Sequence, residues 1–352
     1  MMSRRPTVSI CIPTFNGAKY LHQAIESALA QSLTDFELLI VDDASTDDTL
    51  SIAQAFARRD ARIRVHQNSR RLGLGGNWNR CLELAGGEWI KFLFQDDYLA
   101  PECVARMYEL GSARGATLVA CDRDFVFEEG VPASFRELFL RYVSEHNLSV
   151  RFPGNQGHIS NIEFAALVAE YPTENCIGEP TSVMFLRSAC GRFGSFNTDL
   201  GQLIDWEYWM RIGVNEGLCF LDEPLAAFRL HRQAATLSNQ SESGIRVVGV
   251  DALIIRHELV YNPFYEPVRV AARPGSLKQK LFAQYHGTRA LAREVASQRD
   301  PADSPAINSW EQITEVYRLK ESYPRALLLS SNYYFMRILK KLGSLIPPKV
   351  LP

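Results

Sequence analysis

The feature that most constrains the fold is a regular alternation of strand-like and helix-like segments over the first hundred residues. Apolar runs of strand length stand at residues 8–12, 36–41, 63–65 and 89–94. Between them, apolar residues recur at the three- and four-residue spacing of a helix that buries one face. Parallel strands need long crossovers, usually helices, so this order predicts an α/β fold. We expect a Rossmann-like, mostly parallel sheet with helices on both faces.

The chain changes character after about residue 237, where strand signals fade and helical spacing continues between prolines. The four expected helices of this part lie at residues 245–260, 277–296, 310–319 and 325–342. We therefore divide the chain into an α/β domain over residues 1–235 and a helical C-terminal region over residues 236–352.

The last of these expected helices combines leucines and tyrosines with a basic side. Its basic residues, and those that follow it, are Arg337, Lys340, Lys341 and Lys349. Such a helix suits the surface of an anionic membrane. The simpler interpretation is a helix packed on the α/β domain or at a homodimer interface, with a solvated basic face. Both interpretations stay open at this point.

Composition narrows the range of partners and compartments. Lys and Arg number 38 and Asp and Glu number 40, a net charge of −2. This balance argues against a nucleic-acid partner, because phosphate backbones are normally met by a basic excess. No run approaches the ~18–20 apolar residues of a membrane span, and the seven cysteines show no metal-binding spacing. We expect a cytoplasmic protein with reduced thiols, either free or peripheral on the inner face of the cytoplasmic membrane.

Two acidic pairs follow two of the expected strands, Asp42-Asp43 and Asp96-Asp97. Ligands of open parallel sheets bind beyond the carboxyl ends of the strands, and paired carboxylates there suit Mg²⁺ or Mn²⁺. One such pair is more often a turn or a helix cap, but two pairs at one sheet edge favour a site. The chain has no Walker loop, and residues 73–78 lack the third glycine of the dinucleotide fingerprint. The diphosphate of a bound nucleotide would therefore have to be held by a metal ion rather than by a phosphate-binding loop.

An ordered set of motifs resembles a known family. The motifs lie at residues 8–16, 31–47, 73–77, 87–97, 203–211 and 228–231. In this order they are similar to the motifs of family 2 glycosyltransferases, and the resemblance covers about residues 7–235. It implies the glycosyltransferase-A fold, a nucleoside diphosphate-sugar donor and inversion at the anomeric carbon.

The resemblance also implies a set of donor-binding residues. The set is Pro13, Thr14, Phe15, Asp43, Asn77 and Asp96. Phe15 stands where the family holds the base and ribose, and its ring suits stacking on uracil, although an aromatic ring more often packs in a core. Asp43 stands where a carboxylate accepts the pyrimidine N3 hydrogen, and Asp96 where one contacts the ribose or the phosphates.

The catalytic and metal-binding residues follow from the same resemblance. Asp97 lies at the metal-ligating position, and His231 matches a histidine near the metal and the diphosphate. Asp205 matches the catalytic base and, with an ordinary pKa near ~3.9, would be ionised at neutral pH. From the residues alone, Asp205 is equally well a helix cap, and His231 is more often an ordinary histidine, partly buried or at the surface. Residues 178–181 are a candidate loop under the donor sugar.

Two positions depart from the family pattern. Phe94 replaces the first acid of the metal motif, and Ile204 replaces the Glu of the Glu-Asp pair. Both changes spare the positions that carry the chemistry. Trp206, Tyr208 and Trp209 either stack on an acceptor sugar or pack in the core, and at least one of the two tryptophans is expected in the core.

We therefore expect an inverting, Mn²⁺- or Mg²⁺-dependent glycosyltransferase. It would move a sugar from a UDP- or dTDP-sugar to an acceptor hydroxyl of a growing polysaccharide or glycolipid. One alternative is a sugar-phosphate nucleotidyltransferase, which residues 13–19 disfavour because they hold one glycine and one lysine rather than a glycine-rich basic loop. The other alternative is a degenerate, non-catalytic domain that binds a membrane or a partner, as the missing first acid would allow.

Overall fold

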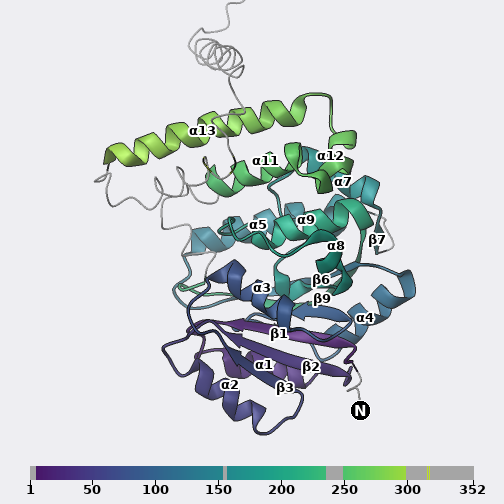
Figure 1. Ribbon diagram of the computed structural model, residues 1–352, viewed down its shortest axis with the longest axis vertical. Coiled ribbons are helices and arrows are strands. Elements are labelled where there is room, and N and C mark those ends of the chain that lie inside the picture. The colour runs from purple at the N-terminus through teal and green to yellow at the C-terminus, as the bar shows by residue number, and fades with distance from the viewer. Residues whose placement is uncertain (1–4, 154–156, 235–248, 299–314, 316, 318–352) are drawn as a thin grey trace, which may run out of the picture.

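The computed structural model describes residues 5–153, 157–234, 249–298, 315 and 317. The expected alternation of strands and helices in the first hundred residues is confirmed (Figure 1). Its elements are β1 (Val8–Thr14), α1 (Leu21–Leu29), β2 (Phe36–Asp42), α2 (Thr49–Ala57), β3 (Ile63–Gln67), α3 (Leu74–Leu84) and β4 (Trp89–Phe92).

The middle of the chain is richer in helix than the sequence indicated. Its elements are β5 (Tyr98–Leu99), α4 (Cys103–Arg114), β6 (Leu118–Phe127), α5 (Ala133–His146), α6 (Leu148–Arg151), β7 (His158–Ile159), α7 (Asn161–Glu170), the 3₁₀ turn η1 (Pro180–Ser182), β8 (Val183–Leu186), α8 (Ser188–Phe193), α9 (Ile204–Glu216) and β9 (Leu218–Leu230). The mixed sequence of residues 128–156 predicts loops with one short helix, but α5 alone has 14 residues. None of its residues is buried, although Phe135, Phe139 and Val143 recur at every fourth position and are half-buried.

One sheet of nine strands organises the described residues, in the order β3-β2-β1-β4-β8-β6-β9-β5, with β7 beside β9. The β3-β2-β1-β4 half is parallel throughout, as expected. The other half is mixed, because β8 runs antiparallel to both β4 and β6. The parallel half brings the carboxyl ends of β1, β2 and β4 to one edge.

Helices cover both faces of the sheet, as expected, and each face has its own core. The side chains of α1, α2 and α4 pack in one hydrophobic cluster. Those of α3, α7, α8 and α9 pack in the other. Burial of an apolar face on each side is what an α/β sheet requires.

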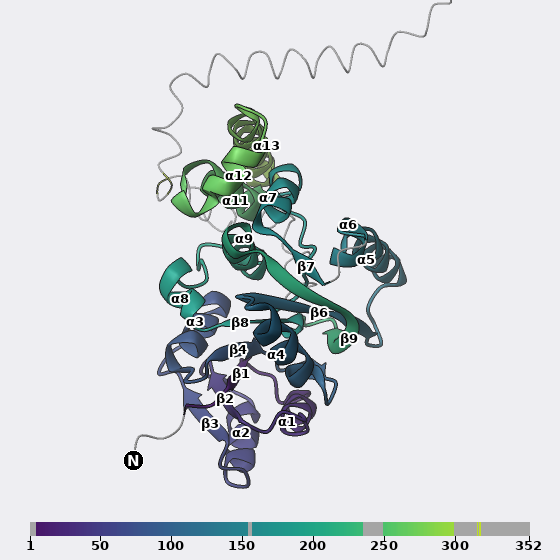
Figure 2. The ribbon, with the colours of Figure 1, turned by 90° about the vertical axis from the view of Figure 1, so that its right-hand side faces the viewer.

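The C-terminal helices extend this second core. They are α11 (Ala252–Tyr261), the 3₁₀ turn η3 (Pro263–Tyr265), α12 (Glu266–Ala271) and α13 (Ser276–Gln298). Leu253, Tyr265 and Val268 are fully buried in the cluster that holds α9. Figure 2 shows α11, α12 and α13 stacked beyond α9, on the side away from α1 and α2. The helices expected at 310–319 and 325–342 lie outside the described residues, apart from residues 315 and 317.

Two further expectations concern the cysteines and the membrane. All seven cysteines are free thiols, and six of them are buried. Within the described ranges, no helix combines the length and the apolar character that a crossing of the bilayer requires.

Candidate active site

The loops that follow β1 and β2 are bound to each other. The Ser45 hydroxyl accepts a hydrogen bond from the Asn16 N–H at 2.9 Å, and the Asn16 side-chain oxygen accepts one from the Thr46 N–H at 2.9 Å. Asn16 (φ 47°) and Ala44 (φ 57°) both adopt left-handed backbone conformations. Because Ala44 has a Cβ, its conformation costs free energy that the surrounding hydrogen bonds must offset. The two loops thus form one pre-organised surface at the sheet edge.

Asp43 lies inside this edge and anchors the segment before α3. The residue is 2% exposed, and its carboxylate accepts hydrogen bonds from the Asn68 side chain (2.9 Å) and from the N–H groups of Leu72 (2.7 Å) and Gly73 (2.9 Å). Asp43 therefore holds residues 68–73 against the ends of the strands.

Three of the expected donor-binding residues are also buried here. Pro13 lies within β1, and the Thr14 hydroxyl donates to an Asp42 oxygen at 3.3 Å. The Asn77 amide donates to the Val41 carbonyl (3.0 Å) and accepts from Asn68 (2.9 Å). These contacts tie β1, β2 and α3 together.

Phe15 is the half-buried aromatic residue of this edge. The guanidinium carbon of Arg71 lies 3.9 Å from the centroid of its ring. The Gln95 side chain accepts from the Phe15 N–H at 2.9 Å and donates to the Phe15 carbonyl at 3.1 Å. Sequence reasoning missed both partners, although Arg71 lies just before the 73–77 motif and Gln95 lies within the metal motif.

The two carboxylates after β4 have different environments. Asp97 is 1% exposed and accepts hydrogen bonds from the Thr181 hydroxyl and from the Arg229 N–H, the latter at 2.9 Å. Burial, followed by the nearby charge of Asp96, raises the pKa of Asp97 well above its usual value. Asp96 is more exposed, and its carboxylate lies 3.0 Å from the His231 Nε2. His231, expected beside Asp97 at the metal, is thus brought together with Asp96.

Residues around His231 fix this arrangement. The Arg229 Nε donates to the Asp96 carbonyl at 2.8 Å, and another guanidinium nitrogen donates to Gln23 at 2.7 Å. The Tyr20 ring centroid lies 4.9 Å from that of His231. The described residues contain no group of three or more His, Cys, Asp and Glu side chains placed to hold a metal. Asp96 and His231 thus form a contacting carboxylate–imidazole pair at this edge.

Asp205 lies in the first turn of α9 and is 8% exposed. One oxygen accepts the Trp206 N–H at 2.7 Å, and the other is 3.5 Å from the Asn175 amide nitrogen. Burial, followed by the charge of Glu179, raises the pKa of Asp205 to about 7. A carboxyl group with this pKa can accept a proton near neutral pH.

Residues 175–182 connect Asp205 with Asp97. At one end Asn175 contacts Asp205, and at the other the Thr181 hydroxyl binds Asp97. Between them, Glu179 pairs with the buried Arg123 at 2.6 Å. Gly178 has φ +116°, and a Cβ there would lie 2.6 Å from the Ser182 hydroxyl. The loop is therefore tightly built. Sequence reasoning had singled out residues 178–181 but not the Arg123 partner.

The aromatic residues after Asp205 do not line a surface. Trp206, Tyr208 and Trp209 are all fully buried. The Trp206 ring N–H donates to the Pro172 carbonyl at 2.9 Å. Stacking of these rings on an acceptor sugar is therefore excluded, because α9 is covered by the sheet on one side and by the C-terminal helices on the other.

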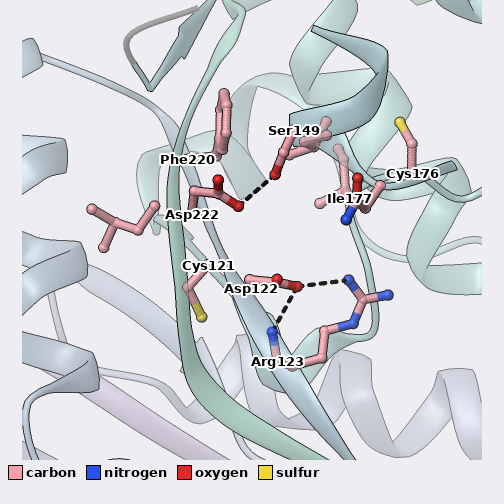
Figure 3. A pocket seen from close by; sticks show the side chains of 11 residues that line it. Cys121, Asp122, Arg123, Ser149, Cys176, Ile177, Phe220 and Asp222 are labelled. Carbon is pink, nitrogen blue, oxygen red and sulfur yellow. Dashed lines mark hydrogen bonds and ion pairs between the residues drawn. The ribbon is translucent and has the colours of Figure 1, made fainter. Parts of the chain in front are cut away.

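A small cavity beside Arg123 is lined by residues of β6, β9, α6 and the segment 176–177 (Figure 3). Its volume is about 10 Å³, enough for about one water molecule. Asp122 there approaches the Arg123 guanidinium at 3.9 Å, and Ser149 donates to Asp222 at 2.5 Å. The cavity is too small for a nucleotide-sugar.

The family assignment rests on a comparison with known proteins. A family model described as Glycosyl transferase family 2 matches residues 9–192, just over half of the chain. The chain belongs to glycosyltransferase family 2. It is therefore an enzyme of the glycosyltransferase class, and neither alternative function finds support in the comparisons.

Curated relatives of this family 2 enzyme match it over different lengths. The uncharacterized protein MT1568 of Mycobacterium tuberculosis is 33% identical over 231 residues, which are 64% of this chain and 67% of that protein. The chondroitin synthase of Escherichia coli is 42% identical over 29% of this chain and 15% of that protein. The succinoglycan biosynthesis protein ExoO of Rhizobium meliloti is 33% identical over 45% of this chain and 47% of that protein.

Solved structures confirm the glycosyltransferase-A fold. The mannosyltransferase PcManGT from Pyrobaculum calidifontis, in complex with GDP-Man and Mn²⁺, superposes with a TM-score of 0.54 at 16% identity, over 94% of this chain and 87% of that one. S. aureus TarS 1-349, in complex with UDP-GlcNAc, superposes with a TM-score of 0.53 at 18% identity, over 89% of this chain and 92% of that one.

Proposed function

We propose that this family 2 enzyme transfers a sugar, with inversion, from a UDP- or dTDP-sugar to an acceptor hydroxyl of a polysaccharide or glycolipid. The observation that carries the proposal is the tight loop at 175–182, which joins the Asp205 carboxyl to the carboxylate pair after β4. The anomeric carbon of a donor must lie between the group that holds its diphosphate and the base that activates the acceptor. The relatives named for chondroitin synthesis and succinoglycan biosynthesis support a glycan acceptor.

Asp205 is the proposed general base. It would take the proton of the acceptor hydroxyl as that oxygen attacks the anomeric carbon and the nucleoside diphosphate leaves. Its pKa of about 7 suits this task, because a base works best when its pKa lies near the working pH. A positioned base of this kind typically contributes about 10²–10⁴-fold in rate.

Asp96 and His231 are the proposed ligands of a divalent cation. A carboxylate oxygen and an imidazole nitrogen 3.0 Å apart are a donor set that suits Mn²⁺ or Mg²⁺ with phosphate oxygens and water as further ligands. A cation held there would offset the charge that grows on the leaving diphosphate. We place Asp96 beside the cation because Asp97 is 1% exposed and each of its oxygens already accepts a hydrogen bond, from Thr181 or from Arg229. Asp97 stays the ligand that the family resemblance predicts.

The nucleotide is proposed to bind at the ends of β1 and β2. The Phe15 ring, already covered by Arg71, offers a flat apolar face for a pyrimidine. Asp43 accepts three hydrogen bonds from the protein. We propose that it forms the floor of the base site and accepts the N3 hydrogen with its less occupied oxygen.

The decisive experiment compares Asp205→Asn with the wild-type chain. A panel of UDP- and dTDP-sugars is first screened by thermal shift with Mn²⁺, and turnover is then measured as nucleoside diphosphate released from the most stabilising donor. We expect the variant to lose at least about 10²-fold in kcat while its donor affinity stays within about threefold. Wild-type kcat in Asp205→Asn would overturn the assignment of the base.

A further inference from the structure

We propose that Asp251, from the C-terminal helices, is a positioning residue for the catalytic helix α9. The inference rests on the proposed role of Asp205 as the base. Asp251 is fully buried, and its carboxylate accepts hydrogen bonds from three consecutive backbone N–H groups. These belong to Gly201 (3.0 and 3.1 Å), Gln202 (2.7 Å) and Leu203 (3.1 Å).

These three residues lead directly into α9, whose first turn contains Asp205. The first N–H groups of a helix lack partners within the helix, and a side chain just before it usually caps them. The residue at this position in α9 is Leu203, and no side chain there makes a capping hydrogen bond. A carboxylate 48 to 50 residues further along the chain binds the approach to this helix instead. Its negative charge also suits a helix N-terminus.

The C-terminal helices hold Asp251 in turn. The Gly249 carbonyl, two residues before Asp251, accepts hydrogen bonds from Gln284 (3.3 Å) and Thr288 (3.2 Å) of α13. Thr288 is 1% exposed, so this contact lies inside the packed core. The position of Asp251 therefore depends on α13.

Two more contacts hold α9 along its length. The Tyr265 hydroxyl donates to the Glu207 carboxylate at 2.6 Å, and Glu207 also pairs with Arg211 at 2.6 Å. Near the end of the helix, the Asn215 side chain donates to the Phe264 carbonyl at 2.9 Å. Both views show α11 beside α9 (Figures 1 and 2). The segment from Gly249 to α13 thus fixes the position of α9, and with it the position of Asp205 beside the loop at 175–182.

The residues proposed to bind the base are held by contacts other than those of the C-terminal helices. They come from β1, β2 and the loops after them, and hydrogen bonds join Phe15 to Gln95, Asn16 to Ser45 and Asp43 to Gly73. Loss of Asp251 should therefore displace Asp205 and leave the donor site in place. Misplacement of a catalytic group by about 1 Å can cost about 10²-fold in rate.

The test is Asp251→Asn in the full chain, with Val268→Ala as the matched control. An amide in place of the carboxylate cannot accept all four contacts, whereas Val268 is a fully buried apolar residue of α12, whose side chain can form no hydrogen bond to residues 201–203. For each chain we would measure the melting temperature, kcat and donor KM with the donor selected above. We expect Asp251→Asn to lower kcat by about 10- to 100-fold with donor KM within about threefold, and Val268→Ala to keep its kcat at a similar loss of melting temperature.

Three outcomes overturn the proposal: wild-type kcat in Asp251→Asn, a donor KM that rises as much as kcat falls, or an equal loss of kcat in Val268→Ala. If Asp251→Asn does not fold, Thr288→Val takes its place, because it removes one of the two hydrogen bonds to the Gly249 carbonyl. It should lower kcat by a smaller factor. An unchanged kcat in Thr288→Val would also overturn the proposal. Loss of activity in Asp205→Asn with full activity in Asp251→Asn would refute the positioning role alone. Full activity in Asp205→Asn would refute the proposed function as well.

Discussion

His231 Nε2 lies 3.0 Å from the Asp96 carboxylate, whereas Asp97, the next residue, is bound by Thr181 and Arg229 inside the protein. Two adjacent acids therefore have different environments, and we propose separate tasks for them, Asp96 at the surface of the site and Asp97 in its support.

This division predicts different effects for the two acids. Asp96→Ala and His231→Ala should each remove activation by Mn²⁺, with a fall in kcat of at least about 10²-fold and little change in melting temperature. Asp97→Ala should mainly lower stability, by about 1–3 kcal/mol, because it leaves the buried Thr181 hydroxyl and Arg229 N–H without their acceptor. Glu109, an exposed acid of α4, supplies the control Glu109→Gln, which should change neither property. Retained Mn²⁺ activation in Asp96→Ala would refute the proposed ligand.

The raised pKa of Asp205 predicts how activity depends on pH. Because the base must be ionised, kcat/KM should rise tenfold per pH unit well below pH 7 and level off above it. A profile measured between pH 5 and 9 at constant ionic strength and saturating Mn²⁺ tests this. An acidic limb centred near pH 4 would show that Asp205 has an ordinary pKa in the working enzyme.

The same pKa predicts a pH-dependent gain in stability for Asp205→Asn. The folded pKa of about 7 lies above the unfolded value near 3.8, so ionisation is unfavourable in the folded state. Wild-type stability is therefore lost, relative to the variant, as the pH rises from about 4 to about 7. The difference should be absent near pH 4 and reach at most about 4 kcal/mol above pH 7. Denaturant unfolding of both chains at pH 4.5 and pH 8 measures it, and an equal difference at both pH values would contradict the prediction.

The left-handed backbone of Ala44 predicts that glycine at this position, beside the proposed nucleotide site, raises the stability of the fold. Its φ of 57° is strained for alanine and free of strain for glycine, so Ala44→Gly should stabilise the fold by about 0.5–1 kcal/mol. The control is Ala57→Gly at the end of α2, where glycine should destabilise by a similar amount. The measurement is the midpoint of urea unfolding for the wild-type chain, Ala44→Gly and Ala57→Gly. A lower midpoint for Ala44→Gly than for the wild type would show that the backbone of Ala44 is not strained.

The close approach of Gly17 to Gln95 predicts that substitutions at these two residues have coupled effects on nucleotide binding. A Cβ at Gly17 would overlap the Gln95 side chain that binds the Phe15 backbone. Gly17→Ala should therefore displace Gln95, loosen Phe15 and weaken UDP binding by about tenfold, or about 1.4 kcal/mol. In Gln95→Ala the space is free, so adding Gly17→Ala should cost little more. Isothermal titration of the four chains with UDP and Mn²⁺ gives the coupling energy, and additive losses would argue against the contact.

Local patterns in the sequence predicted the α/β half well. The strands β1 to β4 alternate with helices because apolar runs and helical spacing are properties of neighbouring residues, and the acids at the ends of β2 and β4 follow directly from the order of residues. The same holds for Asp205 in the first turn of α9. In contrast, the length of α5 was missed, although Phe135, Phe139 and Val143 recur at helical spacing.

What the sequence by itself determined is thus the order of strands and helices in the first hundred residues, the acids at the strand ends and the family to which the chain belongs. Only the tertiary structure decided that Asp96 rather than Asp97 meets His231, since that depends on a contact 135 residues apart in the chain. It also decided that Trp206, Tyr208 and Trp209 are buried, and that Asp251 binds the approach to α9. The reason is physical: side-chain direction, burial and pKa are set by residues that only folding brings together.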